Sequence, residues 1–206
     1  YDVHDLIREF LLQSLDKPSK EDLHNKAVSW YTKQTSSSQI ALELIYHLIS
    51  SSRHEDATQL IVEQGRDLIK EGHIELLGLL ESIDTKSVGA DSACRVDRLR
   101  GEVLALLGRF DEAEEAFNQA KPPAEAAGLD DVIADIVSNL ADIALKRGDS
   151  EGSLAMHRKA LELFISMGDA IGSARSYNNM GYILRRNGDK AKALEAYGEV
   201  EKILSG

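Results

Sequence analysis

The chain has 206 residues, 43% of them hydrophobic and only three of them proline, which suits one or two ordered domains with a sizeable core. Its net charge of −11 opposes non-specific binding to DNA or to an anionic membrane, because like charges repel. No apolar run is long enough to span a membrane and no signal peptide is visible, while the single cysteine, Cys94, excludes an internal disulfide and favours a reducing, cytoplasmic compartment.

The first part of the chain is predicted to be helical, since no useful stretch alternates with period two. Apolar residues at helical spacing predict a helix over 1–15, with Asp2 at its start. The segment 16–19, which contains Pro18, is expected to break the helix, and Ser19 with Asp22 resembles a capping box that opens the next one. Further helices are expected around 41–48, 57–68 and 74–80, with polar linkers at 35–39 and 84–91. Because the helical pattern begins almost at Tyr1, we expect the chain to be a fragment of a longer protein.

From about residue 92 the chain repeats itself every 40 residues. The segments "RLRGEVLALLGRFDEAEEAF", "SNLADIALKRGDSEGSLAMH" and "NNMGYILRRNGDKAKALEAY" align, and glycine recurs every 20 residues at 108, 128, 148, 168 and 188. Such a step is one helix plus one turn, and each glycine is predicted to end a helix in a left-handed conformation that costs another residue about 1–2 kcal/mol. Two helices make a hairpin, and neighbouring hairpins must stack to bury their apolar faces.

Small and large residues recur at fixed places in these hairpins. Small residues stand at Gly101, Ala141 and Gly181 and at Ala113, Ser153 and Ala193, and rings stand at Phe117, His157 and Tyr197. This pattern resembles the tetratricopeptide repeat, with Ser153 and His157 as departures and with a period of 40 residues in place of the usual 34. The resemblance implies an all-α, right-handed superhelix of antiparallel helix pairs, with three repeats over 92–206. In the first repeat, Pro122 and Pro123 predict a kink or a restart of the second helix.

A second resemblance covers the first part of the chain. The order of "HDLIREFL", "HNKAVSWY", "ALELIYHLISSSRHEDATQLI" and "GRDLIKEGHIELLGLLESI" is similar to the region between the winged helix and the repeat sensor of signal-transduction ATPases with numerous domains. This resemblance implies that residues 1–15 end an upstream winged-helix-like domain and that residues 19–84 form a helical arm before the repeats. The nucleotide-binding core would then lie outside this chain.

No motif indicates catalysis, a cofactor or a metal. The phosphate-loop pattern G-x-x-x-x-G-K-[ST] is missing, and "GDSEGS" at 148–153 is interpreted as a turn and a helix start. No H-E-x-x-H occurs, and His157 is predicted to pack, because its sister repeats carry aromatic residues at that position. Carboxylates are plentiful, but they are expected to lie on solvated helix faces, and no two of them are marked as an acid–base pair. We therefore expect no enzyme.

The surface that remains is the concave groove which, by the resemblance, the first helix of each repeat lines. The candidate ligand-binding residues there are Asp135, Asn139, Asp142, Lys146, Arg175, Asn178, Asn179, Tyr182, Arg185 and Arg186. Asn139 and Asn179 are equivalent and could bind a peptide backbone, but they could equally hydrogen-bond the neighbouring helix. The arginines and Lys146 could hold a carboxylate or phosphate, or could simply complement a helix dipole.

These observations favour a non-catalytic binding module, the arm and sensor of a signalling ATPase, whose groove takes a protein, a peptide such as an acidic segment, or a small effector. A static adaptor that joins two proteins is the alternative. Nucleic acid and membrane are not expected as partners. The apolar end of the last repeat could contact further repeats or another molecule, so oligomerisation through the C-terminal end is possible.

Overall fold

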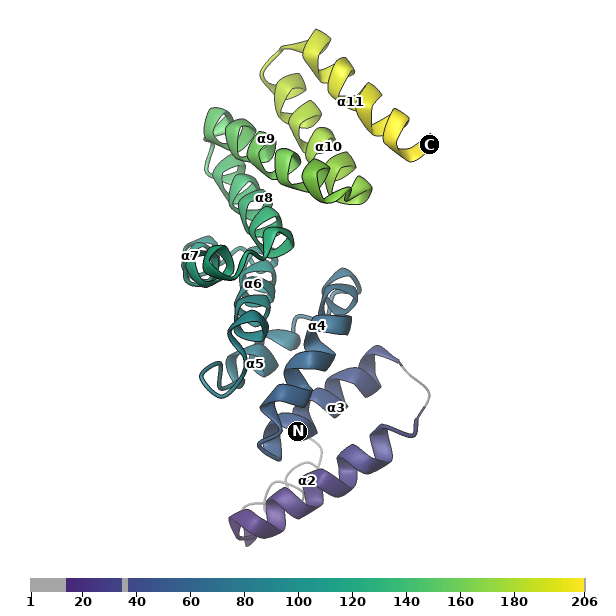
Figure 1. The fold of residues 1–206 in the computed structure, drawn as a ribbon, viewed down its shortest axis with the longest axis vertical. Helices are drawn as coiled ribbons and strands as arrows, with labels where there is room; N and C mark the ends of the chain where they lie inside the picture. Colours follow the sequence, from purple (N-terminus) through teal and green to yellow (C-terminus); the bar gives the residue numbers. More distant parts are fainter. Residues whose placement is uncertain (1–13, 35–36, 206) are drawn as a thin grey trace. The chain divides into compact units, whose positions relative to one another are not determined.

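The computed structural model describes residues 14–34 and 37–205, and every regular element in that part of the chain is an α-helix. The all-α fold of helix pairs predicted from the sequence is confirmed (Figure 1). The chain divides into two compact units, Tyr1–Val96 (unit 1) and Asp97–Gly206 (unit 2). The helix expected over 1–15 lies almost entirely outside the described residues.

Unit 1 contains α2 (Lys17–Tyr31), α3 (Ser38–Ser50), α4 (His54–Lys70) and α5 (Leu76–Glu81). Neighbouring helices in sequence pack on each other, α2 against α3 and α3 against α4. The chain continues through α6 (Ala90–Leu106), in which the boundary between the units falls.

The start of α2 corrects the predicted capping box. The cap is Asp16, whose Oδ1 accepts a hydrogen bond from the Ser19 backbone N–H at 3.0 Å, and the helix begins at Lys17. Pro18 lies in the first turn, where a helix needs no N–H donor and the fixed φ of proline already suits it. The prediction that Ser19 opens the helix was therefore wrong. The predicted linker at 35–39 is also shorter at its end, because Ser37 caps α3 and Ser38 already belongs to it.

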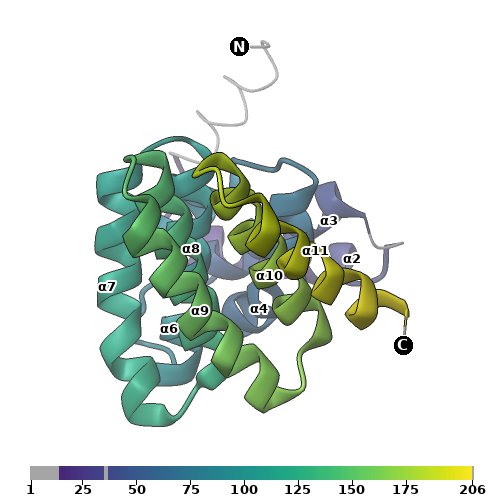
Figure 2. The ribbon, with the colours of Figure 1, turned by 90° about the horizontal axis from the view of Figure 1, so that it is seen from above.

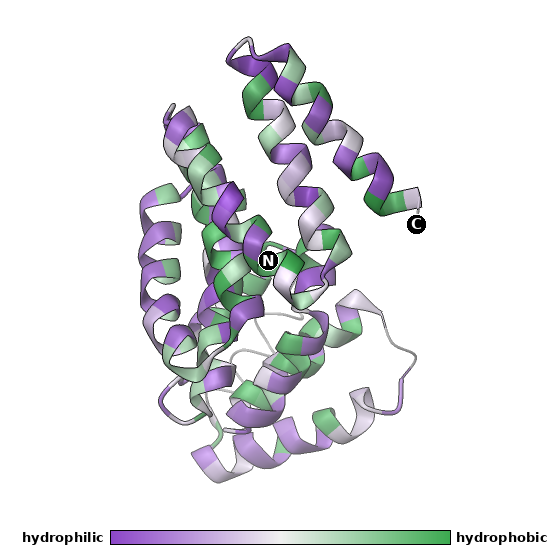
Figure 3. Cartoon of the chain, turned by 45° about the horizontal axis from the view of Figure 1, so that its top comes forward, coloured by the Kyte–Doolittle hydropathy of each residue, from purple (hydrophilic) through white to green (hydrophobic). Residues whose placement is uncertain are grey.

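Unit 2 contains the C-terminal part of α6 and then α7 (Phe110–Ala127), α8 (Asp130–Lys146), α9 (Ser150–Met167), α10 (Ala170–Arg186) and α11 (Lys190–Ser205). Each of α8 to α11 packs on the helix before it (Figure 2). Hydrophilic residues lie on the outer sides of the helices, as on the outward side of α7, and hydrophobic residues face neighbouring helices (Figure 3). We call α6–α7, α8–α9 and α10–α11 the first, second and third hairpins.

The glycine ladder sets the length of these helices. Gly108, Gly128, Gly148, Gly168 and Gly188 all have positive φ, between 68° and 92°, so the predicted left-handed turns are confirmed. After three of them an aspartate caps the next helix. Asp149 Oδ1 accepts from the Gly152 N–H at 2.8 Å, Asp169 Oδ1 from the Gly172 N–H at 2.9 Å, and Asp189 Oδ1 from the Lys192 N–H at 3.2 Å. A Gly-Asp pair therefore ends one helix and starts another.

The small residues of the repeats lie against the large ones. A Cβ atom added to Gly101 would lie 2.5 Å from the Phe117 ring, and one added to Gly181 would lie 2.6 Å from the Tyr197 ring. In the second hairpin the same two positions hold Ala141 and His157. Alanine is larger than the glycine of the other hairpins and the histidine ring is smaller than theirs, and both side chains are buried. Interiors this dense leave little room for either partner to grow.

Helix α7 runs from Phe110 to Ala127 with Pro122 and Pro123 inside it. Of the two outcomes predicted at this place, the restart is therefore wrong, the kink stays a prediction, and the helix is retained as expected. Both prolines are exposed, and so are Asn118 and Gln119, whose carbonyl groups lose their N–H partners. Water can bond to carbonyl groups on an exposed face, which allows the helix to continue.

Candidate functional site

The two equivalent asparagines bind neighbouring helices. Asn139 Nδ2 lies 3.4 Å from Glu102 Oε1 and also donates to the backbone oxygen of Asp135 at 2.9 Å. Asn179 Nδ2 donates to Asp142 Oδ1 at 3.2 Å. Both side-chain contacts join a residue to an acidic residue 37 positions earlier, on the first helix of the preceding hairpin. Of the two roles that the sequence left open, the structure shows the link between hairpins.

Asp135 lies inside a run of charges that also crosses between hairpins. Its side chain is buried and pairs with Arg175 at 3.0 Å on one side and with Arg98 at 3.8 Å on the other. Arg98 is itself buried and pairs with Glu102 on its own helix. This buried carboxylate links the first helices of the three hairpins, and it offers little surface to a ligand.

Two of the predicted groove arginines lie over aromatic rings. The Arg175 guanidinium is centred 5.4 Å from the Phe164 ring, and that of Arg185 is 5.8 Å from the Tyr182 ring. These are cation–π distances, and they orient both side chains along the surface of the repeat. Asn178 is exposed and lies outside the pocket described next.

A hollow of about 340 Å³ opens between the second and third hairpins. It is lined by Asp142, Leu145, Lys146, Gly148, Asn179, Tyr182 and Arg186, and we call it the groove pocket. The structure thus brings five of the ten predicted site residues together: Asp142, Lys146, Asn179, Tyr182 and Arg186. The remaining five, Asp135, Asn139, Arg175, Asn178 and Arg185, do not line it.

The charged residues of the groove pocket differ in whether they have a partner within the protein. Within residues 14–34 and 37–205, Lys146 and Arg186 have no ion pair, and both side chains are exposed. The Asp142 carboxylate, in contrast, accepts from Asn179 and lies 3.1 Å from His157 Nε2. Two cations of the pocket are therefore unpaired, while its one acidic group already accepts a hydrogen bond from Asn179.

His157 lies behind the pocket and is fully buried, as predicted from its alignment with aromatic residues. Its Nε2 is close to Asp142 but lacks the angle of a hydrogen bond. The sequence reasoning did not foresee this contact with the pocket wall. The 40-residue register could have indicated it, because His157 follows Asp142 by 15 residues, just as Phe117 follows Glu102 in the first hairpin.

The part of the chain that the structure describes offers neither a metal centre nor a membrane span. No group of three or more histidine, cysteine, aspartate or glutamate side chains there could hold a metal ion. Among the described helices, none combines the length and the apolar character that crossing a membrane requires.

Comparison with known families identifies the repeats. A tetratricopeptide-repeat family model matches residues 132–205, and a second tetratricopeptide-repeat model matches residues 95–119. The chain therefore carries tetratricopeptide repeats over these residues, as the glycine ladder and the ring positions predicted.

Known structures share the fold. The chain is 18% identical to BtubC (BKLC) from P. vanneervenii, with a TM-score of 0.60 over 92% of this chain and 74% of that one. It is 12% identical to aspartyl phosphate phosphatase F from Bacillus subtilis, with a TM-score of 0.67 over 80% of this chain and only 44% of that one. It is 14% identical to the MamA protein, with a TM-score of 0.57 over 90% and 92%. A search of curated protein sequences found no match. Identities this low establish the fold alone.

Proposed function

We propose that the chain is a non-catalytic binding module that holds an extended, acidic peptide segment of another protein in the groove pocket. The observation that carries this proposal is the pair of unengaged cations, Lys146 and Arg186, on one hollow of a protein whose net charge is −11. Tetratricopeptide repeats are in general protein-interaction modules, which fits this use of the groove.

The other residues of the pocket suit a peptide. Asn179 gives one amide hydrogen to Asp142, and its carbonyl oxygen can accept a peptide N–H. Tyr182 is partly exposed and offers a ring face and a hydroxyl group. Arg186 can bind a carboxylate with two parallel hydrogen bonds, whereas Lys146 adds a point charge. Together these groups recognise both the backbone and the charge of an acidic segment.

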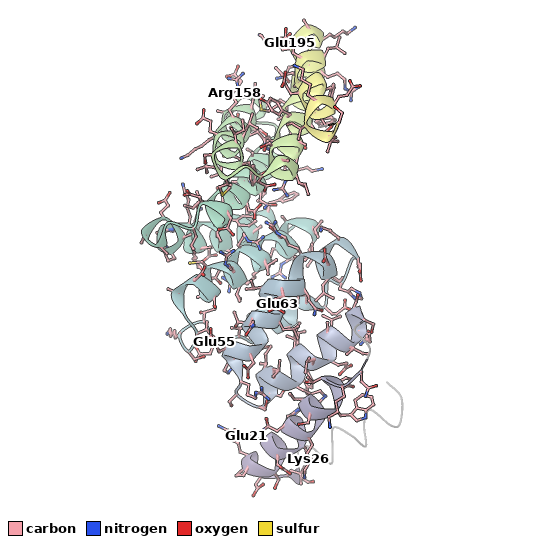
Figure 4. All side chains as sticks on the ribbon, turned by 45° about the vertical axis from the view of Figure 1, so that its right-hand side comes forward. Glu21, Lys26, Glu55, Glu63, Arg158 and Glu195 are labelled. Carbon is pink, nitrogen blue, oxygen red and sulfur yellow. The ribbon has the colours of Figure 1, made fainter. Side chains whose placement is uncertain are left out.

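The test uses a fluorescein-labelled tetraglutamate peptide, with tetraglutamine as the uncharged probe, and measures anisotropy against the intact chain. Tetraglutamate should bind, tetraglutamine should not, and the affinity should fall as the salt concentration rises. Lys146→Ala and Arg186→Ala should each weaken binding about fivefold, equivalent to about 1 kcal/mol. Arg158→Ala, an exposed arginine on α9 outside the pocket (Figure 4), is the control and should leave the affinity unchanged. Equal binding of the two peptides would refute the proposal.

We further propose that the module is the sensor of a signal-transduction ATPase, as the order of segments in residues 4–83 suggests. The support is the sequence resemblance alone. In the parent gene, a phosphate-binding loop and a winged helix upstream of Tyr1 are expected; an upstream sequence without them would favour the static adaptor. A sensor also has to bind its ligand more tightly in one of two states of its parent, which an adaptor does not.

A further inference from the structure

The second hairpin places an ionisable ring behind the one carboxylate that lines the groove pocket. Asp142 belongs to the pocket wall, and His157 Nε2 lies 3.1 Å from its Oδ1. The Asp142 side chain is 51% exposed, whereas that of His157 is fully buried. Within residues 14–34 and 37–205, neither ring nitrogen of His157 has a hydrogen-bond partner. Asp142 is therefore the group that can balance the positive charge of a protonated ring.

Packing alone does not require a histidine at this position. In the 40-residue register the other hairpins carry Phe117 and Tyr197 there, and neither ring can gain a positive charge. A buried imidazole whose nitrogens lack hydrogen-bond partners costs free energy that a phenylalanine ring avoids. The presence of His157 therefore needs a reason other than filling space, and its contact with Asp142 supplies one.

The first hairpin shows which partner Asp142 lacks. Its counterpart there, Glu102, pairs with Arg98 one turn earlier on the same helix. In the second hairpin the place of that arginine is taken by the uncharged Ser138. Among the described residues, His157 is the only basic side chain at ion-pair distance from Asp142. Arginine stays charged, whereas histidine changes its charge between about pH 5 and 8, so Asp142 has a partner that a proton switches on.

The charge of Asp142 matters because of the cations beside it. The helices packed against α9 are α8 and α10, and the titratable and charged groups that they bring to the pocket are Asp142, Lys146, Tyr182 and Arg186. While His157 is neutral, the Asp142 carboxylate repels an anion held by Lys146 and Arg186. A proton on His157 offsets the charge of that carboxylate, so the pocket attracts an anion more strongly.

We propose that His157 acts as a proton-controlled partner of Asp142, and that its protonation strengthens the binding of an anionic ligand in the groove pocket. This inference rests on the function proposed above and adds the regulation of that site by pH. The proton comes from solvent. Because linkage is reciprocal, a ligand that prefers the protonated form also draws a proton onto the chain when it binds.

The test compares the affinity of tetraglutamate at pH 8 and at pH 6, where glutamate side chains stay ionised. The peptide carries a rhodamine label whose charge does not change over this range, and anisotropy measures binding. The intact chain should bind about fivefold more tightly at pH 6. His157→Gln, which cannot take up the proton, should change less than twofold. His73→Gln, in unit 1, controls for the other histidines and should keep the fivefold gain.

A second variant avoids a substitution in the core. Asp142 is half exposed, so Asp142→Asn should fold normally, and its amide oxygen can still accept the hydrogen bond from Asn179. Since the repelling carboxylate is gone, this variant should bind tetraglutamate about fivefold more tightly than the intact chain at pH 8. It should also change less than twofold between pH 8 and pH 6. Circular dichroism checks that both variants keep their helices.

Calorimetry at pH 7, in two buffers of different ionisation enthalpy, counts the protons taken up on binding. The intact chain should take up more than His157→Gln, and equal uptake would overturn the proposal. An equal gain on acidification in the intact chain and in His157→Gln would overturn it as well. Binding of tetraglutamate that does not change with pH refutes this inference alone. No binding at either pH refutes the proposed function, and this inference with it.

Discussion

In unit 2, residues 132–138 of α8 are all buried, whereas in unit 1 α2 buries only Val28. The difference follows from the neighbours of each helix. Helix α8 packs against α7 and α9, while α2 packs against α3. In a stack of repeats, a helix has neighbouring helices on two sides, so apolar residues on both of these sides become buried. Unit 1 lacks this periodicity and leaves large side chains such as Trp30 exposed.

The largest expected effect compares one ring from each unit. Phe117→Ala should lower the free energy of unfolding by about 3–5 kcal/mol, because Phe117 is fully buried and fills the space beside Gly101. Trp30→Ala should cost less than about 1 kcal/mol, because the Trp30 side chain is 58% exposed. Urea unfolding followed by circular dichroism measures both, and similar losses would contradict the contrast between the units.

The next largest effect concerns the turns. Gly148 has φ of 92° and no atom within 4 Å of an added Cβ, so Gly148→Val should cost about 1–2 kcal/mol through backbone strain alone. In unit 1, Ser52 adopts φ of 60°, and Ser52→Gly should stabilise by about 0.5–1 kcal/mol. Thermal unfolding gives the two signs, and a neutral Gly148→Val would show that the left-handed turn is not required.

A smaller effect separates two adjacent asparagines. Asn179→Ala removes a hydrogen bond to the Asp142 carboxylate and should cost about 1 kcal/mol. Asn178→Ala is the control, because Asn178 is exposed and has no hydrogen-bond partner in the part of the chain that the structure describes, and its change should stay within about 0.5 kcal/mol. If the two variants unfold at the same urea concentration, Asn179 does not link the hairpins.

The smallest effect depends on pH. Burial raises the pKa of Asp97 above its usual value, although Arg100 at 3.1 Å partly opposes this. Because the raised pKa belongs to the folded state, the ionised carboxylate destabilises the protein at neutral pH, and this penalty disappears as the pH falls below the pKa of the unfolded chain. Asp97→Asn should therefore raise Tm at pH 7, and the gain should shrink on acidification. A gain independent of pH would point to packing instead of charge.

The sequence was sufficient for the architecture of unit 2. The ladder from Gly108 to Gly188 predicted where helices end, and the recurrence of Gly101 with Phe117 predicted which residues touch within a hairpin. These features are local or periodic, so one-dimensional spacing contains them. The exact effect of the prolines was not predictable. Pro18 lies inside the first turn of α2 and α7 does not restart at Pro122, because tolerance of proline depends on whether the lost N–H lies in a first turn or on an exposed face.

The position of the groove pocket was predictable from the sequence, but the contacts of its residues were not. The register placed Lys146, Asn179 and Arg186 on one side of the first helices, and the structure gathers them in one pocket. It did not show that Asn179 is bound by Asp142 or that Arg175 is bound by Asp135, because those contacts require the stacking of one hairpin on the next. The spacing of residues within a repeat predicts on which face of a helix a side chain lies. Which residue that side chain contacts depends on how one repeat stacks on the next.

If the groove pocket selects which cation meets a ligand, as proposed, the neighbouring residues Arg185 and Arg186 should differ in their effect on binding. They are adjacent on α10, but only Arg186 lines the pocket, while the Arg185 guanidinium lies 5.8 Å from the centre of the Tyr182 ring. The measurement is the affinity of tetraglutamate for Arg185→Ala and Arg186→Ala. We expect about a fivefold loss of affinity for Arg186→Ala and less than a twofold loss for Arg185→Ala. Equal losses, or a larger loss for Arg185→Ala, would contradict it.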